Sequence, residues 1–107
     1  MKNIAIYGST GSIGTSTLNV IRDNKEIFNV RVLVARKNVS KLIEQIEEFE
    51  PKYVYIESSK NAKILNDKFP DLKVYYGPEG MKEISNITDY DVFVSALVGV
   101  SRVTSHI

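Results

Sequence analysis

The chain has 107 residues, 43% of them hydrophobic and 25% charged, which is typical of an ordinary folded domain. Its net charge of +1 provides no strong field for nucleic acid or an anionic membrane, and the absence of cysteine excludes disulfides, thiolate-bound zinc and a cysteine nucleophile. No apolar run approaches the roughly 20 residues that span a bilayer. The first expected strand begins almost at the first residue, which leaves no room for a secretory segment, so we expect a cytoplasmic protein.

Segments with strand character alternate with segments of helical period. Runs rich in valine, isoleucine, tyrosine and phenylalanine predict strands, and apolar residues at helical spacing predict helices between them. We expect Ser58 or Ser59 to cap the third helix and Pro78 to open the fourth. In chain order, the predicted elements are a strand at 3–7, a helix at 12–23, a strand at 30–35, a helix at 39–49, a strand at 53–57, a helix at 58–69, a strand at 73–76, a helix at 78–84 and a strand at 91–96.

This alternation predicts a Rossmann-like, doubly wound α/β fold. Parallel strands need right-handed crossover connections, which place helices on both faces of the sheet. Residues 1–107 are therefore expected to form one three-layer α/β/α domain, with no internal repeat. The last segment, SALVGVSRVTSHI, leaves the fifth strand and stops in what reads as the start of another helix. We expect the N-terminal part of a longer protein, truncated at its C-terminus; a natural tail is the alternative.

Three glycines lie between the first predicted strand and the first predicted helix. Gly8, Gly11 and Gly14 have the spacing G-x-x-G-x-x-G, in the strand, turn and helix setting of a dinucleotide-binding loop. Gly8 permits a tight turn, Gly11 leaves space for a pyrophosphate, and Gly14 lets the helix pack closely. The free amides and the dipole of the helix N-terminus then favour an anion. The alternative is a glycine-rich corner without a ligand. Hydroxyl groups that can add donors are those of Ser9, Thr10 and Ser12.

Basic residues at the end of the second predicted strand indicate the cofactor. In such folds an acidic residue about 20 positions beyond the glycines binds the ribose of NAD, whereas a basic residue accommodates the 2′-phosphate of NADP. Arg36 stands at about that distance from Gly14, followed by Lys37 and Asn38. Two cations and an amide donor favour NADP. The alternative is that both cations are ordinary solvated loop charges and that Asn38 caps the next helix.

Four segments carry a resemblance to a known family: GSTGSIGTSTLNVI, LVARKNVSKLIEQIEEFEPKYV, GPEGMKEI and VFVSALVG. They are similar to the N-terminal NADPH-binding domain of 1-deoxy-D-xylulose 5-phosphate reductoisomerases, over nearly the whole chain. One departure is Arg36, where the family commonly has glycine; arginine could strengthen the phosphate contact or crowd the adenine. The resemblance implies that the pyrophosphate lies against Thr10, Gly11, Ser12 and Ile13, and that the 2′-phosphate is surrounded by Arg36, Lys37 and Asn38.

The resemblance also implies an activity for the full-length protein. That family isomerises and reduces 1-deoxy-D-xylulose 5-phosphate to 2-C-methyl-D-erythritol 4-phosphate with NADPH, in the non-mevalonate isoprenoid pathway. It implies a homodimer and a divalent metal (Mg, Mn or Co) bound by carboxylates of a later domain. We therefore expect no catalytic residue and no metal ligand in this chain, and no turnover by the chain alone. The strand end around Ala96, Leu97 and Gly99 is expected near the nicotinamide.

Two alternatives belong to other classes: a non-catalytic NADPH-binding module, and a short-chain-dehydrogenase-like oxidoreductase, whose Tyr-x-x-x-Lys pair does not occur in the chain. The remaining candidate groups favour structural roles. The only histidine, His106, is expected on a helix surface. Three glutamates are expected on the solvated side of a helix rather than at a metal: Glu44, Glu47 and Glu48. Four tyrosines are expected in the core or on the sheet surface rather than against nucleic acid: Tyr53, Tyr55, Tyr75 and Tyr76.

Overall fold

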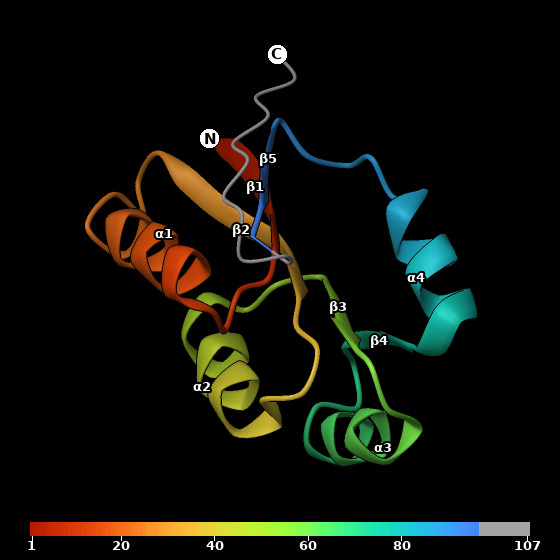
Figure 1. Cartoon of the computed structure of the whole chain (residues 1–107). Coiled ribbons are helices and arrows are strands. Elements are labelled where there is room, and N and C mark those ends of the chain that lie inside the picture. The colour runs from red at the N-terminus through yellow and green to blue at the C-terminus, as the bar shows by residue number, and fades with distance from the viewer. Residues whose placement is uncertain (97–107) are drawn as a thin grey trace.

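Strands and helices alternate along residues 1–96, the part of the chain that the computed structural model describes (Figure 1). The predicted elements are confirmed, with bounds that differ by at most two residues. The expectations for Leu97, Gly99 and His106, and for a further helix, lie outside the described residues. The elements are β1 (Lys2–Tyr7), α1 (Ser12–Arg22), β2 (Phe28–Val34), α2 (Val39–Phe49), β3 (Tyr53–Ile56), α3 (Ser59–Lys68), β4 (Lys73–Tyr76), α4 (Gly77–Ser85) and β5 (Val92–Ser95).

The order of the strands determines which face of the sheet each helix covers. The strands are parallel and lie in the order β4-β3-β2-β1-β5. The chain moves one way across the sheet from β1 to β4 and then returns past β1 to β5. Crossover connections between parallel strands are right-handed. Because the direction across the sheet reverses after β4, the first three connecting helices cover one face and α4 covers the other (Figure 1). The predicted three-layer, Rossmann-like fold is confirmed, with three helices on one face of the described sheet and one on the other.

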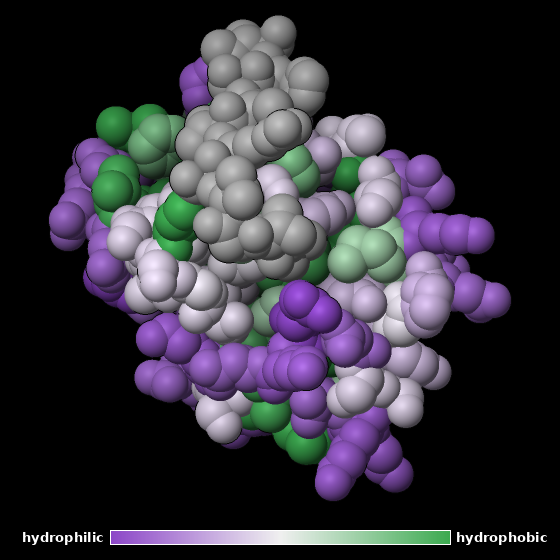
Figure 2. Space-filling view, in the orientation of Figure 1, coloured by the Kyte–Doolittle hydropathy of each residue, from purple (hydrophilic) through white to green (hydrophobic). Residues whose placement is uncertain are grey.

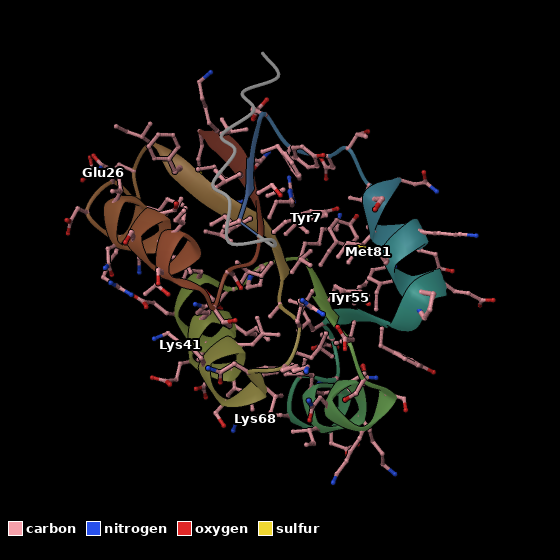
Figure 3. All side chains as sticks on the ribbon, in the orientation of Figure 1. Tyr7, Glu26, Lys41, Tyr55, Lys68 and Met81 are labelled. Carbon is pink, nitrogen blue, oxygen red and sulfur yellow. The ribbon has the colours of Figure 1, made fainter. Side chains whose placement is uncertain are left out.

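Two separate apolar layers correspond to these two faces. Leu18 of α1, Leu42 of α2 and Leu65 of α3 pack with one side of the sheet. On the other side, Tyr7 and Tyr55 pack beneath α4, close to Met81 (Figure 3), and form a second cluster with Ile84. Hydrophilic side chains cover much of the face shown in Figure 2, with hydrophobic ones in small separate areas. No helix within residues 1–96 is long and apolar enough to cross a membrane.

One irregularity interrupts the pairing of β1 with β2. Ile4 pairs with Val30 and the next residue, Ala5, pairs with Val32. Arg31 is therefore an extra residue on β2, a β-bulge that shifts the inward and outward alternation of that strand by one position. This bulge explains why Val30 and Val32 contribute to opposite apolar layers, although they stand two apart in the sequence.

Short polar side chains determine where two of the helices begin. The Asn38 Oδ1 atom accepts a hydrogen bond from the Lys41 backbone N–H at 3.1 Å at the start of α2. Ser58 Oγ accepts one from the Asn61 backbone N–H at 3.2 Å at the start of α3, so Ser58 rather than Ser59 is the cap. At the start of α1 the N-cap is Gly11, which makes no such side-chain bond. The N-terminus of α1 therefore differs from those of α2 and α3.

Candidate cofactor-binding site

A cleft of about 370 Å³ opens at the carboxyl ends of β1, β2 and β5. β1 is the strand at which the sheet changes direction, because β2 lies on one side of it and β5 on the other. In doubly wound sheets, ligands bind outside the strand ends at such a position. We call it the switch-point cleft. It is lined by residues that follow the three strands: Gly8, Thr10, Gly11, Arg36, Lys37, Asn38 and Ala96.

Most of the predicted site residues meet in the switch-point cleft. Thr10 and Gly11 come from the glycine loop, which we define as residues 8–14, and Arg36, Lys37 and Asn38 form the basic loop after β2. Backbone bonds hold the strand ends together: the Gly8 N–H donates to the Val34 carbonyl and the Ala96 N–H to the Tyr7 carbonyl, both at 2.7 Å. Of the residues expected to contact the pyrophosphate or the 2′-phosphate, Ser12 and Ile13 do not line the cleft; they lie in the first turn of α1.

The three glycines meet different geometric requirements. Gly8 has a φ of 90°, a conformation that residues with side chains disfavour. A Cβ atom on Gly14 would lie 2.2 Å from the Gly8 carbonyl oxygen and 2.6 Å from the Cα of Ser9. A Cβ atom on Gly11 would meet the same oxygen at 3.6 Å, an ordinary contact. The turn therefore requires Gly8 and Gly14, whereas Gly11 leaves space in the cleft that the fold itself does not need.

The N-terminus of α1 is chemically suited to an anion. Gly11 has an extended conformation and provides no capping side chain, and the first turn contains no acidic residue. Bonding within the helix begins at Thr15, whose N–H and Oγ1 donate to the Gly11 carbonyl at 2.8 and 2.6 Å. The backbone N–H groups of Ser12, Ile13 and Gly14 have no partner within the helix. These groups and the helix dipole together present partial positive charge.

Ser9 does not meet the expectation of a hydroxyl donor to a phosphate. Its side chain is fully buried, and it is not among the residues that line the cleft. Instead its backbone joins the glycine loop to two other elements. The Ser9 N–H donates to the Val34 carbonyl at 3.0 Å, and the Ser9 carbonyl accepts a bond from Gln45 Nε2 at 2.8 Å. Gln45 was not among the residues predicted from the sequence, although a glutamine three residues after Leu42 and four before Phe49 is a polar residue on the buried face of α2.

The basic loop is exposed and partly ion-paired. The Arg36 Nε donates to Glu57 Oε2 at 3.1 Å, with the two side chains 60% and 46% exposed. Within residues 1–96, the terminal amino groups of Arg36 make no further hydrogen bond, so they stay free to donate. Asn38 caps α2, as the alternative interpretation expected. That bond uses only its Oδ1 atom, so its side-chain NH₂ group can still donate. Lys37 is exposed at the cleft.

The switch-point cleft is not the largest cavity of the described chain. A cavity of about 600 Å³ lies at the C-terminal ends of α2 and α3. Among the described residues, its lining has three carboxylates, from Glu47, Glu50 and Asp71, against one cation, Lys68. That balance of charge repels the phosphates of a dinucleotide. The smaller switch-point cleft suits them better, because the described residues that line it include two cations and no acidic residue.

The glutamates and tyrosines for which structural roles were predicted lie outside the switch-point cleft. The three helical glutamates are exposed, as expected. Arg22 donates to Glu48, with Nη2 at 2.6 Å from Oε1, and this bond lowers the pKa of Glu48. Burial raises the pKa of both Tyr7 and Tyr55, and the Tyr55 hydroxyl donates to the Gly77 carbonyl at 3.0 Å. In residues 1–96, no three His, Asp or Glu side chains are grouped so that they could hold a metal ion.

The strand order and the glycine loop between β1 and α1 define the class: a Rossmann-like α/β protein. Comparison with known proteins then gives the family. The sequence profile of the 1-deoxy-D-xylulose 5-phosphate reductoisomerase family matches residues 4–107, and the chain therefore belongs to that family. This membership favours the reductoisomerase interpretation over the short-chain-dehydrogenase alternative.

Individual relatives agree with this assignment. The chain is 41% identical over 100 residues to the 1-deoxy-D-xylulose 5-phosphate reductoisomerase of Shouchella clausii, covering 92% of this chain and 26% of the relative. It is 42% identical over 102 residues to that of Porphyromonas gingivalis, covering 94% and 26%. A solved DOX-P reductoisomerase in complex with NADPH, fosmidomycin and magnesium matches with a TM-score of 0.77 and 29% identity, over 87% of this chain and 24% of that one. The chain thus spans about a quarter of the length of its relatives.

Proposed function

We propose that this chain is the NADPH-binding domain of a 1-deoxy-D-xylulose 5-phosphate reductoisomerase. The observation that carries the proposal is the switch-point cleft, where an uncapped helix N-terminus and two cations converge at the strand where the sheet changes direction. Additional support is that a related DOX-P reductoisomerase was solved in complex with NADPH. The match covers residues 4–107, so we assign the whole chain to this one domain.

The residues present fit the two charged parts of NADPH. The Gly11 position leaves space for the pyrophosphate, the amides of Ser12 and Ile13 donate to it, and the Thr10 hydroxyl adds a donor. Arg36 and Lys37 bind the 2′-phosphate, and the Asn38 NH₂ group donates to it. The Nε–H of Arg36 already donates to the Glu57 carboxylate, so the terminal amino groups of Arg36 are the ones that donate to the phosphate. NADPH, when bound, supplies the hydride for a reduction.

The activity belongs, in this proposal, to a longer protein. There, NADPH would supply the hydride for reduction of the isomerised form of 1-deoxy-D-xylulose 5-phosphate, and residues outside this chain would hold a divalent metal. The chain contributes binding and orientation of the cofactor, with Ala96 at the nicotinamide end of the cleft. We further propose that the full-length enzyme is a cytoplasmic homodimer. The alternative is a non-catalytic NADPH-binding module. Turnover of 1-deoxy-D-xylulose 5-phosphate by the protein that a longer reading frame encodes would distinguish the two.

Calorimetric titration with NADPH and NADH tests the proposal. We expect the chain to prefer NADPH and to turn over no 1-deoxy-D-xylulose 5-phosphate by itself. Arg36→Ala should weaken NADPH binding by at least about tenfold, since a hydrogen bond to a charged group is worth about 1.5–3 kcal/mol and 1.4 kcal/mol is tenfold in the dissociation constant, and it should leave NADH binding unchanged. Lys68→Ala is the matched control, because it removes an exposed cation that does not line the switch-point cleft. Equal or tighter binding of NADH by the unmodified chain would refute the proposed function.

A further inference from the structure

We propose that Gln45 is a positioning residue for the cofactor, because it holds the glycine loop in the conformation that receives the pyrophosphate. The inference rests on the proposed function and adds a residue that does not itself line the switch-point cleft. Gln45 acts through the Ser9 carbonyl, and Ser9 in turn fixes the two residues that follow it, Thr10 and Gly11, which line the cleft.

The contact between Gln45 and the glycine loop is a buried hydrogen bond. The side chain of Gln45 is 6% exposed, Ser9 is 0% exposed, and Nε2 lies 2.8 Å from the Ser9 carbonyl oxygen. A hydrogen bond in such surroundings has little competition from water. The two residues lie far apart in the sequence, so this bond fixes the distance from α2 to the turn between β1 and α1.

The Ser9 peptide is held by three different elements. Its N–H donates to the Val34 carbonyl at the end of β2. Its Cα faces Gly14 of α1, where an added Cβ would approach to 2.6 Å. Gln45 provides the third restraint, from α2. The contacts with β2 and α1 involve only backbone, so Gln45 is the one side chain among these restraints, and a substitution there changes the loop without altering the glycines.

The requirements of the core do not explain why position 45 is a glutamine. The buried face of α2 otherwise consists of apolar side chains, those of Leu42, Ile46 and Phe49. Gln45 Oε1 is buried and has no hydrogen-bond partner within residues 1–96, and an unpaired buried acceptor costs stability. Methionine at this position would fill similar space without that cost. The bond to the Ser9 carbonyl is therefore what the amide contributes.

The place of Gln45 on α2 determines which part of the cofactor it affects. Asn38 caps α2 and lies beside Arg36 and Lys37, whereas Gln45 lies about two turns further along the helix and contacts the glycine loop. The pyrophosphate is common to NADPH and NADH, and the 2′-phosphate is not. Loss of the Gln45 bond should therefore weaken the binding of both cofactors by the same factor, whereas a substitution in the basic loop should weaken the binding of NADPH alone.

The test uses the 107-residue chain with Gln45→Met, titrated with NADPH and with NADH below the unfolding transition. We expect both dissociation constants to rise about tenfold, with their ratio unchanged. The matched control is Ile46→Val, the next residue of the same buried face of α2. It should lower the unfolding temperature but leave both dissociation constants unchanged, which separates positioning of the loop from general stability. Gln45→Leu serves as a second variant if Gln45→Met does not fold.

Each outcome decides between the inference and the proposed function. Dissociation constants of Gln45→Met within twofold of the unmodified chain would overturn the role of Gln45 and leave the proposed function standing. A loss of affinity for NADPH alone, with NADH binding unchanged, would also overturn the role of Gln45, because the effect would then arise at the basic loop. Failure of the unmodified chain to bind NADPH would overturn the proposed function, and with it the inference.

Discussion

The glycine loop allows a direct comparison of one added methyl group at two positions. In Gly14→Ala the new Cβ would lie 2.2 Å from the Gly8 carbonyl oxygen, and in Gly11→Ala it would lie 3.6 Å from the same atom. Ordinary contact begins near 3.4 Å. Because the atoms that clash with position 14 belong to the backbone, no change of rotamer relieves the overlap. Helix α1 must move away from the loop by about 1 Å, which also disturbs the packing of Leu18 and Ile21.

The expected losses of folding stability in Gly14→Ala and Gly11→Ala differ severalfold. Overpacking of a core typically costs about 1–3 kcal/mol, and a clash against backbone places Gly14→Ala at about 3 kcal/mol or more, a fall of about 12 °C or more in unfolding temperature. Gly11→Ala loses only a favourable N-cap residue, which costs about 1 kcal/mol or less. Gly11→Asp should be neutral or slightly stabilising, because aspartate is a good N-cap and its charge complements the helix dipole.

Thermal unfolding followed by far-UV circular dichroism, together with NADPH titration, measures both effects. We expect Gly11→Asp to remain folded and to lose at least about tenfold in NADPH affinity, because its carboxylate occupies the place of the pyrophosphate and repels it. Equal unfolding temperatures for Gly14→Ala and Gly11→Ala would refute the packing argument. Unchanged NADPH affinity in Gly11→Asp would mean that the loop is a structural corner rather than a phosphate site.

Two further predictions concern side chains at the helix ends. Asn38→Ala and Ser58→Ala each remove an N-cap hydrogen bond, so the free energy of unfolding measured with urea should fall by a similar amount, about 1 kcal/mol, in both variants. Only Asn38→Ala should weaken NADPH binding, because Ser58 does not line the switch-point cleft. Equal NADPH affinity in the two variants would count against a role for the basic loop. The pKa of Glu48 is lowered by its bond from Arg22, so this pair stabilises the fold above the ordinary pKa of 4.5 and the benefit is lost as the pH falls through the lowered value. As the pH is lowered through this range, the unfolding temperature of Glu48→Gln should therefore fall less steeply than that of the unmodified chain. The difference should be small and should shrink with added salt, because the pair is exposed. The same dependence of unfolding temperature on pH in both proteins would contradict the pairing.

Alternating apolar patterns were sufficient to predict the elements and the class of fold. Each predicted strand is short, apolar and separated from the next by a helical period, so little else competes with the α/β interpretation. The β-bulge at Arg31 could not be predicted, because an extra residue in a strand leaves no periodic signature and is defined only by its partner. The excess of helices on one face depends on the strand order, which the pattern of elements does not specify.

The candidate site could be predicted where it depends on strand ends and not where it depends on side-chain direction. Parallel strands bring their carboxyl ends to one edge, so the glycine and basic loops had to meet there. Within the glycine loop no period indicates which way a side chain points, and the buried Ser9 was expected at the phosphate. Gln45 requires knowledge of a partner distant in the sequence.

The two halves of the switch-point cleft differ in how deeply they are embedded in the fold. The basic loop is exposed and follows the fully buried Ala35, so its side chains can be exchanged without repacking the core. The glycine loop is interlocked with α1, β2 and α2 through Gly14, Val34 and Gln45. Redesign of cofactor preference is therefore a local problem in this protein, whereas transfer of its phosphate-binding turn to another scaffold would require three neighbouring elements to be transferred with it.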